Sequence, residues 1–422
     1  MHRYGCVGCG LGPLSGAAAL GLALASASAS AAPGEFLEPE VQVLHQFEGD
    51  QGGGSFGWAV SELGDIDGDG AMEAMAGAPG NSIGGMGAGR SYAFSGKTGA
   101  LLYTFTGDPG DKLGYALADA GDVDGDGTTD IIVGAPGNGP GHARVYSGAD
   151  GLEIAVLAGD TMAGRFGVAV ASAGDLDDDG HADVLVGAEK DLSGGVDAGR
   201  VYAISGADQS TLWTRDGAAG NLLGSGTAPL GDINGDDVPD VVVGAPGQGG
   251  AVWVLSGVDG ADIYPPLVGD PGSANLGNFF VGGLADVNDD DVPDIYGGDY
   301  GADGVGPGAG KAYVWSGKTG ARLFTFAGEF AGDGAGPGRA GGDANGDGVP
   351  DIAVGFYSAT RGDVQGAGLI TLYSGTDGST LRTITGTTAN EQIGFDVVTI
   401  GDVNDDGRDD LVLSGAADNR VY

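Results

Sequence analysis

Short apolar stretches and polar loops alternate along this chain in a fixed, recurring order. An apolar stretch such as FGVAVASAG, from Phe166, precedes an acidic loop, and a second such as DIIVGAP, from Asp130, follows one. A third stretch such as RVYAISG, from Arg200, leads through a Ser-Gly turn to a fourth such as LLYTFTG, from Leu101. Apolar or alternating runs of this length are typical of β-strands. The pattern therefore predicts four strands in each repeating unit.

The acidic loop between the first two stretches occurs seven times, at intervals of 53 to 59 residues. Its copies begin at Asp65, Asp122, Asp175, Asp232, Asp286, Asp343 and Asp402. Self-similarity of this kind indicates an array of supersecondary units that bury their faces against one another. Four antiparallel strands in each of seven units predict an all-β fold, a seven-bladed β-propeller.

The two ends of the repeat array predict how the ring closes. The Ser-Gly turn occurs in six units, and the seventh unit stops at Tyr422, within its third strand. Ahead of the first acidic loop, VLHQFEG (43–49) has the pattern of a fourth strand. We expect this N-terminal strand to pair with the last blade, which would close the ring and remove an open sheet edge. The propeller is then predicted to span residues 41–422.

Residues 1–32 have the composition of a secretory signal peptide, and residues 33–40 are predicted to be a linker. A short basic start precedes an apolar stretch over 11–25, which small residues at alternate positions follow. Both cysteines, Cys6 and Cys9, lie inside this segment. No other apolar run approaches the ~18 residues of a membrane span. We therefore expect a secreted protein, extracellular or at the cell surface, without membrane insertion.

The acidic loops are predicted to bind calcium. Each loop has Asp or Asn at positions 1, 3 and 5, a backbone carbonyl at position 7, and Asp or Glu at position 9. Oxygen ligands at this density suit a hard cation, Ca²⁺ before Mg²⁺ or zinc. Without a cation, three to five carboxylates would repel one another at close range. Up to seven sites follow, and those with Asp237 and Asp291 in place of glycine at position 6 are expected to bind more weakly.

The side-chain ligands predicted for these sites are the following. They are Asp65, Asp67, Asp69 and Glu73; Asp122, Asp124, Asp126 and Asp130; Asp175, Asp177, Asp179 and Asp183; Asp232, Asn234, Asp236 and Asp240; Asp286, Asn288, Asp290 and Asp294; Asp343, Asn345, Asp347 and Asp351; and Asp402, Asn404, Asp406 and Asp410.

The motifs flanking the loops resemble those of a known family. An EF-hand is excluded because strand residues such as Val133 stand at position 12, where that motif needs Glu. Phe56-Gly57 before the loop and Gly77-Ala78-Pro79 after it are similar to the FG-GAP repeats of the integrin α-subunit propeller and of bacterial relatives. The resemblance covers residues 41–422. It implies calcium between the first two strands of a blade, on the face opposite the ligand surface.

Blades five and six depart from the repeat motif. In place of GAP they have Gly297-Gly298-Asp299 and Gly355-Phe356-Tyr357. Blade six also has GAGPGRAGG, from Gly334, where an FG strand is expected. Its innermost strand is therefore the one least supported by the pattern.

Charge and the scarcity of catalytic motifs indicate a binding protein. With 17 Lys plus Arg against 59 Asp plus Glu, the net charge of −42 excludes nucleic acids and anionic lipids as partners. The chain has no HExxH motif, and the loops at the mouth of the central channel opposite the acidic loops have few basic or aromatic residues. We expect no catalytic residues and no organic cofactor. The predicted function is adhesion or binding of an extracellular protein or glycan, and the pattern is compatible with a monomer.

Other functions remain open at this stage. A propeller lyase or hydrolase acting on polysaccharide would place its site at the channel mouth, and a structural surface or matrix component would need no site. The tripeptide Arg361-Gly362-Asp363 lies in a long loop, but chance alone supplies roughly 0.3 copies in a chain of this composition. Its role stays open.

Overall fold

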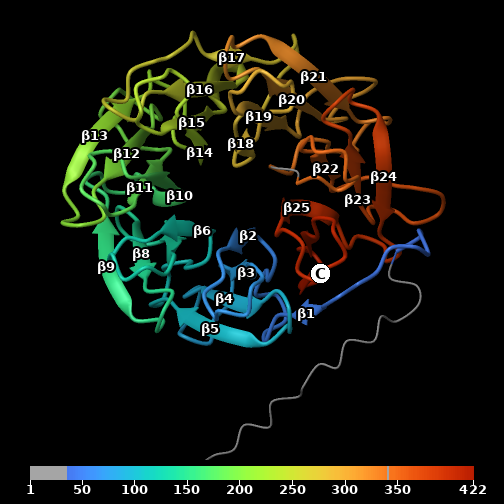
Figure 1. Cartoon of the computed structure of the whole chain (residues 1–422), viewed down its shortest axis with the longest axis horizontal. Coiled ribbons are helices and arrows are strands. Elements are labelled where there is room, and N and C mark those ends of the chain that lie inside the picture. Colours follow the sequence, from blue (N-terminus) through green and yellow to red (C-terminus); the bar gives the residue numbers. More distant parts are fainter. Residues whose placement is uncertain (1–35, 340–341) are drawn as a thin grey trace, which may run out of the picture.

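A computed structural model describes residues 36–339 and 342–422, and the predicted signal peptide lies outside these ranges. Seven antiparallel sheets surround a central axis in chain order (Figure 1), which confirms the seven-bladed all-β propeller. In each complete blade the first strand lies nearest the axis and the fourth lies outermost. Among the described residues the only helical element is a 3₁₀ turn, η1 (Gly247–Gly249).

The strands of the seven blades have the following bounds. Blades one to three contain β2 (Val60–Leu63), β3 (Glu73–Ala78), β4 (Arg90–Ser95) and β5 (Leu101–Thr106); β6 (Ala116–Gly121), β7 (Asp130–Ala135), β8 (His142–Tyr146) and β9 (Glu153–Ala158); and β10 (Phe166–Gly174), β11 (Asp183–Ala188), β12 (Arg200–Ile204) and β13 (Thr211–Asp216). Blades four and five contain β14 (Gly226–Gly231), β15 (Asp240–Ala245), β16 (Ala251–Leu255) and β17 (Leu267–Val268); and β18 (Val281–Leu284), β19 (Asp294–Asp299), β20 (Lys311–Trp315) and β21 (Arg322–Ala327). Blades six and seven contain β22 (Ile352–Phe356), β23 (Leu369–Tyr373) and β24 (Thr380–Thr385); and β25 (Ile393–Thr399), β26 (Leu411–Gly415), β27 (Arg420–Val421) and β1 (Phe47–Glu48).

Contacts between neighbouring blades explain both halves of the FG-GAP motif. The second strands of blades one to six are buried along their whole length, so their side chains form the core between sheets. A Cβ atom added to Gly134 of the GAP sequence would collide with the carbonyl oxygen of Gly167, the FG glycine of the next blade. Gly187 and Gly224 form the same contact one blade further on. The FG glycines also have positive φ angles of 84° and 86°, which favour glycine.

The N-terminal segment closes the ring, as the sequence predicts. β1 pairs antiparallel with β27, with Phe47 opposite Val421 and Glu48 opposite Arg420. The regular pairing is confined to these two residues, although the fourth-strand pattern spans 43–49. The Phe47 ring stacks on Phe94 of blade one, with 4.1 Å between centroids. The segment therefore joins the last blade to the first.

The described part of the predicted linker, residues 36–40, contacts blade six. Phe36 is buried and forms an antiparallel bridge with Gly386, and its ring lies 5.4 Å from that of Tyr422. The backbone N–H of Leu37 donates to the carbonyl of Thr385, at 3.0 Å. The chain thus crosses the outside of blade seven from blade six to blade one.

Blade six lacks a regular inner strand among the described residues. Its sheet contains β22, β23 and β24. The inner position is occupied by an irregular segment, in which Gly336 donates to the carbonyl of Gly355 and Gly355 donates to that of Pro337. Pro337 has no N–H to contribute to a ladder. This agrees with the departure from the FG pattern at this place.

Candidate metal centres

The acidic loops connect the first and second strands of a blade, and their position-1 aspartates determine their shape. The Asp65 carboxylate accepts hydrogen bonds from the backbone N–H groups of Gly68, Asp69 and Gly70, at 2.7 to 3.1 Å. Gly68 and Gly70 have φ angles of 76° and 90°. Positions 4 and 6 therefore both need a left-handed backbone, which favours glycine. Asp237, at position 6 in blade four, adopts it with φ of 68°.

The acid at position 9 begins the second strand and is buried beneath the loop. Glu73 accepts backbone hydrogen bonds from Ile66 and Asp67, at 3.0 and 3.3 Å. It also accepts one from Gly96, at 3.2 Å, in the Ser-Gly turn between the third and fourth strands. In blade two, Asp130 accepts hydrogen bonds from the equivalent residues, Val123, Asp124 and Gly148. The recurring Ser-Gly turn thus anchors the acidic loop, a role that the sequence pattern did not disclose.

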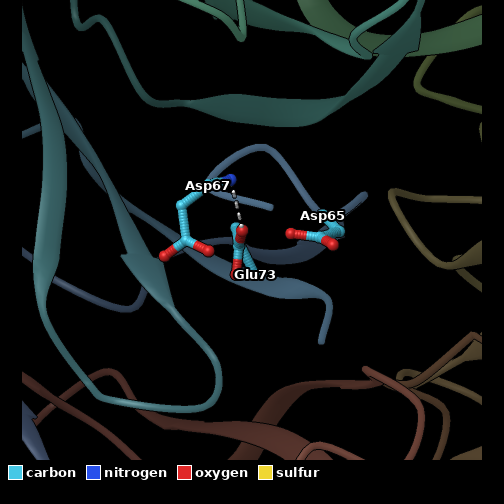
Figure 2. A group of neighbouring side chains, drawn as sticks. All are labelled: Asp65, Asp67 and Glu73. Carbon is cyan, nitrogen blue, oxygen red and sulfur yellow. Dashed lines mark hydrogen bonds between the residues drawn. The ribbon is translucent and has the colours of Figure 1, made fainter. Parts of the chain in front are cut away.

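Carboxylates at positions 1, 3 and 9 converge in blades one to three. In each group the ligand atoms lie within 4.8 Å of one another. Figure 2 shows Asp65, Asp67 and Glu73 around a common space, with the Asp67 N–H directed at Glu73. The groups of the next two blades are Asp122, Asp124 and Asp130, and Asp175, Asp177 and Asp183. An all-oxygen set at this spacing fits a hard cation.

The other four loops have Asn at position 3. The Asn234 amide donates to the Asp240 carboxylate at 3.0 Å, and the Asn345 amide to Asp351 at the same distance. Blades five and seven repeat this contact. Position 3 therefore lies beside position 9 in these loops too, with its amide nitrogen directed at the position-9 carboxylate.

Position 5 lies at the edge of each group. Asp69 accepts hydrogen bonds from the Ala71 N–H at 3.0 Å and from the Ser95 hydroxyl at 3.2 Å. Asp290 likewise accepts one from the Ser316 hydroxyl at 3.3 Å. The structure thus brings positions 1, 3 and 9 together, and it directs position 5 toward the serine of the Ser-Gly turn.

Burial raises the pKa of the position-9 acids. It raises the pKa of Glu73 to about 7 and that of Asp130 to about 6, although backbone N–H donors act in the opposite direction. Asp183, Asp240, Asp294 and Asp410 have a pKa of about 6 for the same reason. In contrast, the N–H of Gly348 lowers the pKa of Asp343 at position 1. Each loop thus holds one buried acid that is poorly stabilised as an anion.

The expectation that the face opposite the acidic loops has few aromatic groups is wrong at the mouth of the central channel. Trp58, Tyr115 and Phe395 gather around a cavity at the channel mouth. Each follows the glycine of an FG-type pair, a signal that the sequence offered.

Two more aromatic residues at this mouth come from the departures in blades five and six. Gly298, rather than Gly297, is the structural equivalent of the GAP glycine. A Cβ atom added to Gly298 would meet the carbonyl of Gly336 in the next blade, which is the contact that the GAP glycines of other blades make. Tyr300 therefore stands where the motif has proline, as does Tyr357 in blade six. Both tyrosines line the cavity.

The Arg361-Gly362-Asp363 tripeptide has its arginine bound within the protein. The Arg361 guanidinium donates to both carboxylate oxygens of Asp333, at 3.1 and 3.2 Å, and lies over the ring of Phe330. Gly362 and Asp363 are exposed. The tripeptide as folded does not present a free arginine.

Comparison with known proteins supports the repeat assignment. The FG-GAP repeat family matches residues 114–149, 166–204 and 224–255, which are blades two to four. Integrin alpha-5 of Xenopus laevis is 34% identical over 212 residues, which are 45% of this chain and 20% of that protein. Integrin alpha-PS2 of Drosophila melanogaster is 31% identical over 219 residues, 46% of this chain and 16% of that protein. This chain therefore carries FG-GAP repeats and spans at most about a fifth of these integrin subunits.

A solved structure shares the fold at low sequence identity. A chain in the crystal structure of BBS1N in complex with ARL6DN superposes with a TM-score of 0.52 and 9% identity, over 85% of this chain and 88% of that one. At this identity the likeness concerns the fold alone. None of the helices in residues 36–339 and 342–422 is long and apolar enough to cross a membrane.

Proposed function

We propose that this protein is a secreted or cell-surface, calcium-binding propeller that acts as a non-catalytic binding module for an extracellular protein or glycan. The observation that carries the proposal is an FG-GAP propeller, similar to integrin α subunits, in which an acidic loop directly precedes the second strand of every blade. These loops occupy one face. The opposite face is then free to bind a partner.

Calcium is the cation that the loops fit best. Carboxylate oxygens at positions 1, 3 and 9 converge in blades one to three, and an Asn amide lies beside the position-9 acid in the other four blades. A bound Ca²⁺ would offset the repulsion among these groups, including the buried acid at position 9. Its role is structural, because it would hold the turn between the two inner strands of a blade.

The stabilisation by calcium should depend on pH. Ligand carboxyls must be ionised to bind the cation, and the position-9 acids have pKa values of about 6 to 7. The fold raises the pKa of these acids, so their protonated forms stabilise the metal-free fold at low pH. This contribution to stability is lost as pH rises through 6 to 7. We expect the melting temperature gained with calcium over EDTA to be large at pH 7.5 and small at pH 5. An equal gain at both pH values would contradict the assignment.

Exposed apolar side chains favour the face opposite the acidic loops as the partner surface. Met86 is 88% exposed and Ile83 is 57% exposed in the long loop of blade one. Leu192 and Val196 in blade three and Val305 in blade five occupy the equivalent loops. Loops carried by a rigid scaffold are frequent binding sites, and the exposed apolar side chains of these loops would supply contact area.

A double substitution tests this surface. Calcium-loaded protein is first screened on an array of extracellular proteins and glycans to identify a partner. The Ile83→Ser, Met86→Ser variant should then bind that partner at least about tenfold more weakly, because interface energy concentrates in a few apolar anchors. The matched control is Leu152→Ser, Val156→Ser, which removes two similarly exposed side chains from β9 and its turn, at the outer edge of blade two. If both variants bind the partner equally well, the partner surface does not include Ile83 and Met86. Turnover of a polysaccharide by the intact protein would contradict the non-catalytic function.

A further inference from the structure

Seven aromatic side chains form a closed series of contacts at the mouth of the central channel opposite the acidic loops, and this series passes from blade two directly to blade five. Trp58, Tyr115 and Phe395 come from the starts of inner strands, whereas Tyr300 and Tyr357 directly follow the second strands of blades five and six. Neighbouring ring centroids lie 5.3 to 6.4 Å apart. The order around the ring is Trp58, Tyr115, Phe279, Phe280, Tyr300, Tyr357, Phe395 and again Trp58.

All seven aromatic residues line a cavity of about 240 Å³. Since a water molecule occupies ~30 Å³ of liquid, this space holds roughly eight waters, or one small ring with its substituents. Apolar residues of β10, among them Val168 and Val170, line another part of it. Phe279 has a φ angle of 66°, an uncommon conformation for a bulky residue, and Phe279 also lines the cavity. The cavity is thus mostly apolar and open at one end of the channel.

Two residues of the cavity lining each have one buried polar atom without a partner among the described residues. These atoms are the Nε–H of Arg339 and the hydroxyl of Thr227. The other end of the Arg339 guanidinium donates to Asp396 at 2.6 Å and to the carbonyl of Val60 at 3.1 Å. A buried donor without an acceptor is costly and needs an explanation. A ligand with hydroxyl oxygens would supply acceptors for both groups.

The charges of the lining favour an uncharged ligand. Arg339 and Asp396 are its only charged residues within the described chain, and they pair with each other. Arg165 lies over the ring of Tyr115, 5.1 Å from its centroid, and pairs with Glu189. The Tyr115 ring is therefore already in contact with a cation.

We infer that this cavity binds a neutral sugar ring, such as a terminal uncharged unit of a glycan. The C–H faces of the sugar would pack on the aromatic ring, and its hydroxyls would pair with Arg339 Nε and Thr227 Oγ1. This inference rests on the proposed function and deepens it, because it specifies the ligand class and its place. The apolar loop surface at Ile83 and Met86 is separate from the cavity.

Free methyl glycosides of glucose, galactose, mannose and N-acetylglucosamine test the inference on the calcium-loaded full chain. Saturation-transfer NMR should show contact with at least one of them, and titration calorimetry should give its affinity. Thr227→Val keeps the side-chain shape and removes the hydroxyl, so it should weaken binding about tenfold without lowering the melting temperature. Trp58→Ala should abolish binding. The matched control, Phe330→Ala, removes an exposed aromatic ring outside the cavity and should leave the affinity unchanged.

Several results would overturn the inference while leaving the proposed function intact. The first is that none of the four glycosides binds, and the second is that binding survives both Thr227→Val and Trp58→Ala. The third is that N-acetyl-arginine amide binds in place of the sugars, which would show a cation site. Partner binding that depends on Ile83 and Met86 would persist in each case. Conversely, loss of the proposed function would appear as the absence of any array partner, whatever the glycosides show.

Discussion

Chelation of divalent cations is expected to lower the melting temperature of this protein by at least about 10 °C. A ligand at a hundredfold excess over its Kd stabilises a fold by about 2.7 kcal/mol per site, and several loops contribute. Without the cation, convergent carboxylates such as Asp65, Asp67 and Glu73 repel one another within each loop. Thermal melts in calcium and in EDTA measure the effect. A melting temperature unchanged by EDTA would contradict calcium-dependent stability.

Single substitutions assign the bound ions to the loops. Asp130→Asn should remove about one calcium ion per chain in elemental analysis, because Asp130 is the buried acid of its loop. Asp150→Asn, in the same blade, is the matched control, since the Asp150 side chain only accepts a hydrogen bond from the Leu152 N–H. An unchanged ion count in Asp130→Asn would exclude this loop as a site.

Deletion of residues 36–48 is expected to abolish cooperative unfolding and to cause aggregation. The deletion removes β1, which leaves the outer edge of β27 unpaired, and it exposes the apolar surface that Phe36 and Phe47 cover. A milder variant, Phe47→Ala, should cost about 2 to 4 kcal/mol because it removes the ring stacked on Phe94.

The control for this variant is Leu152→Ala, at an exposed position of blade two, which should change stability by less than about 0.5 kcal/mol. Chemical denaturation followed by tryptophan fluorescence measures both variants. If the chain without residues 36–48 unfolds in one sharp transition at the original midpoint, the N-terminal segment does not close the ring.

The features that the sequence predicted are those repeated at equivalent positions. Seven copies of one loop predicted the blades, and the fourth-strand pattern at 43–49 predicted the closure that β1 and β27 make. The reason for the FG and GAP glycines was not visible, because Gly134 meets Gly167 across a blade boundary. The position of Asp69 depends likewise on Ser95, which lies on another turn of the blade.

The aromatic ring could not be predicted from repetition, because its members stand at different positions of the repeat. Trp58 and Tyr115 follow an FG-type glycine, whereas Tyr300 and Tyr357 stand in the place of the GAP proline. Contacts such as Trp58 with Phe395 and Tyr115 with Phe279 arise only when blades far apart in sequence surround the axis. A departure from the motif was therefore more informative about this site than the motif itself.

The pairing of β1 with β27 is expected to form late in folding, after the acidic loops. The position-1 aspartate of an acidic loop forms its backbone hydrogen bonds within the loop itself, as Asp65 does with Gly68 and Gly70. In contrast, the contact of Asn419 with the carbonyl of Gly49 joins residues 370 positions apart. Contacts of such long range form slowly, and this one requires the whole chain to be synthesised. We therefore expect the loops to bind their cations while the ring is still open, so that cation supply governs the yield of closed rings as well as their stability.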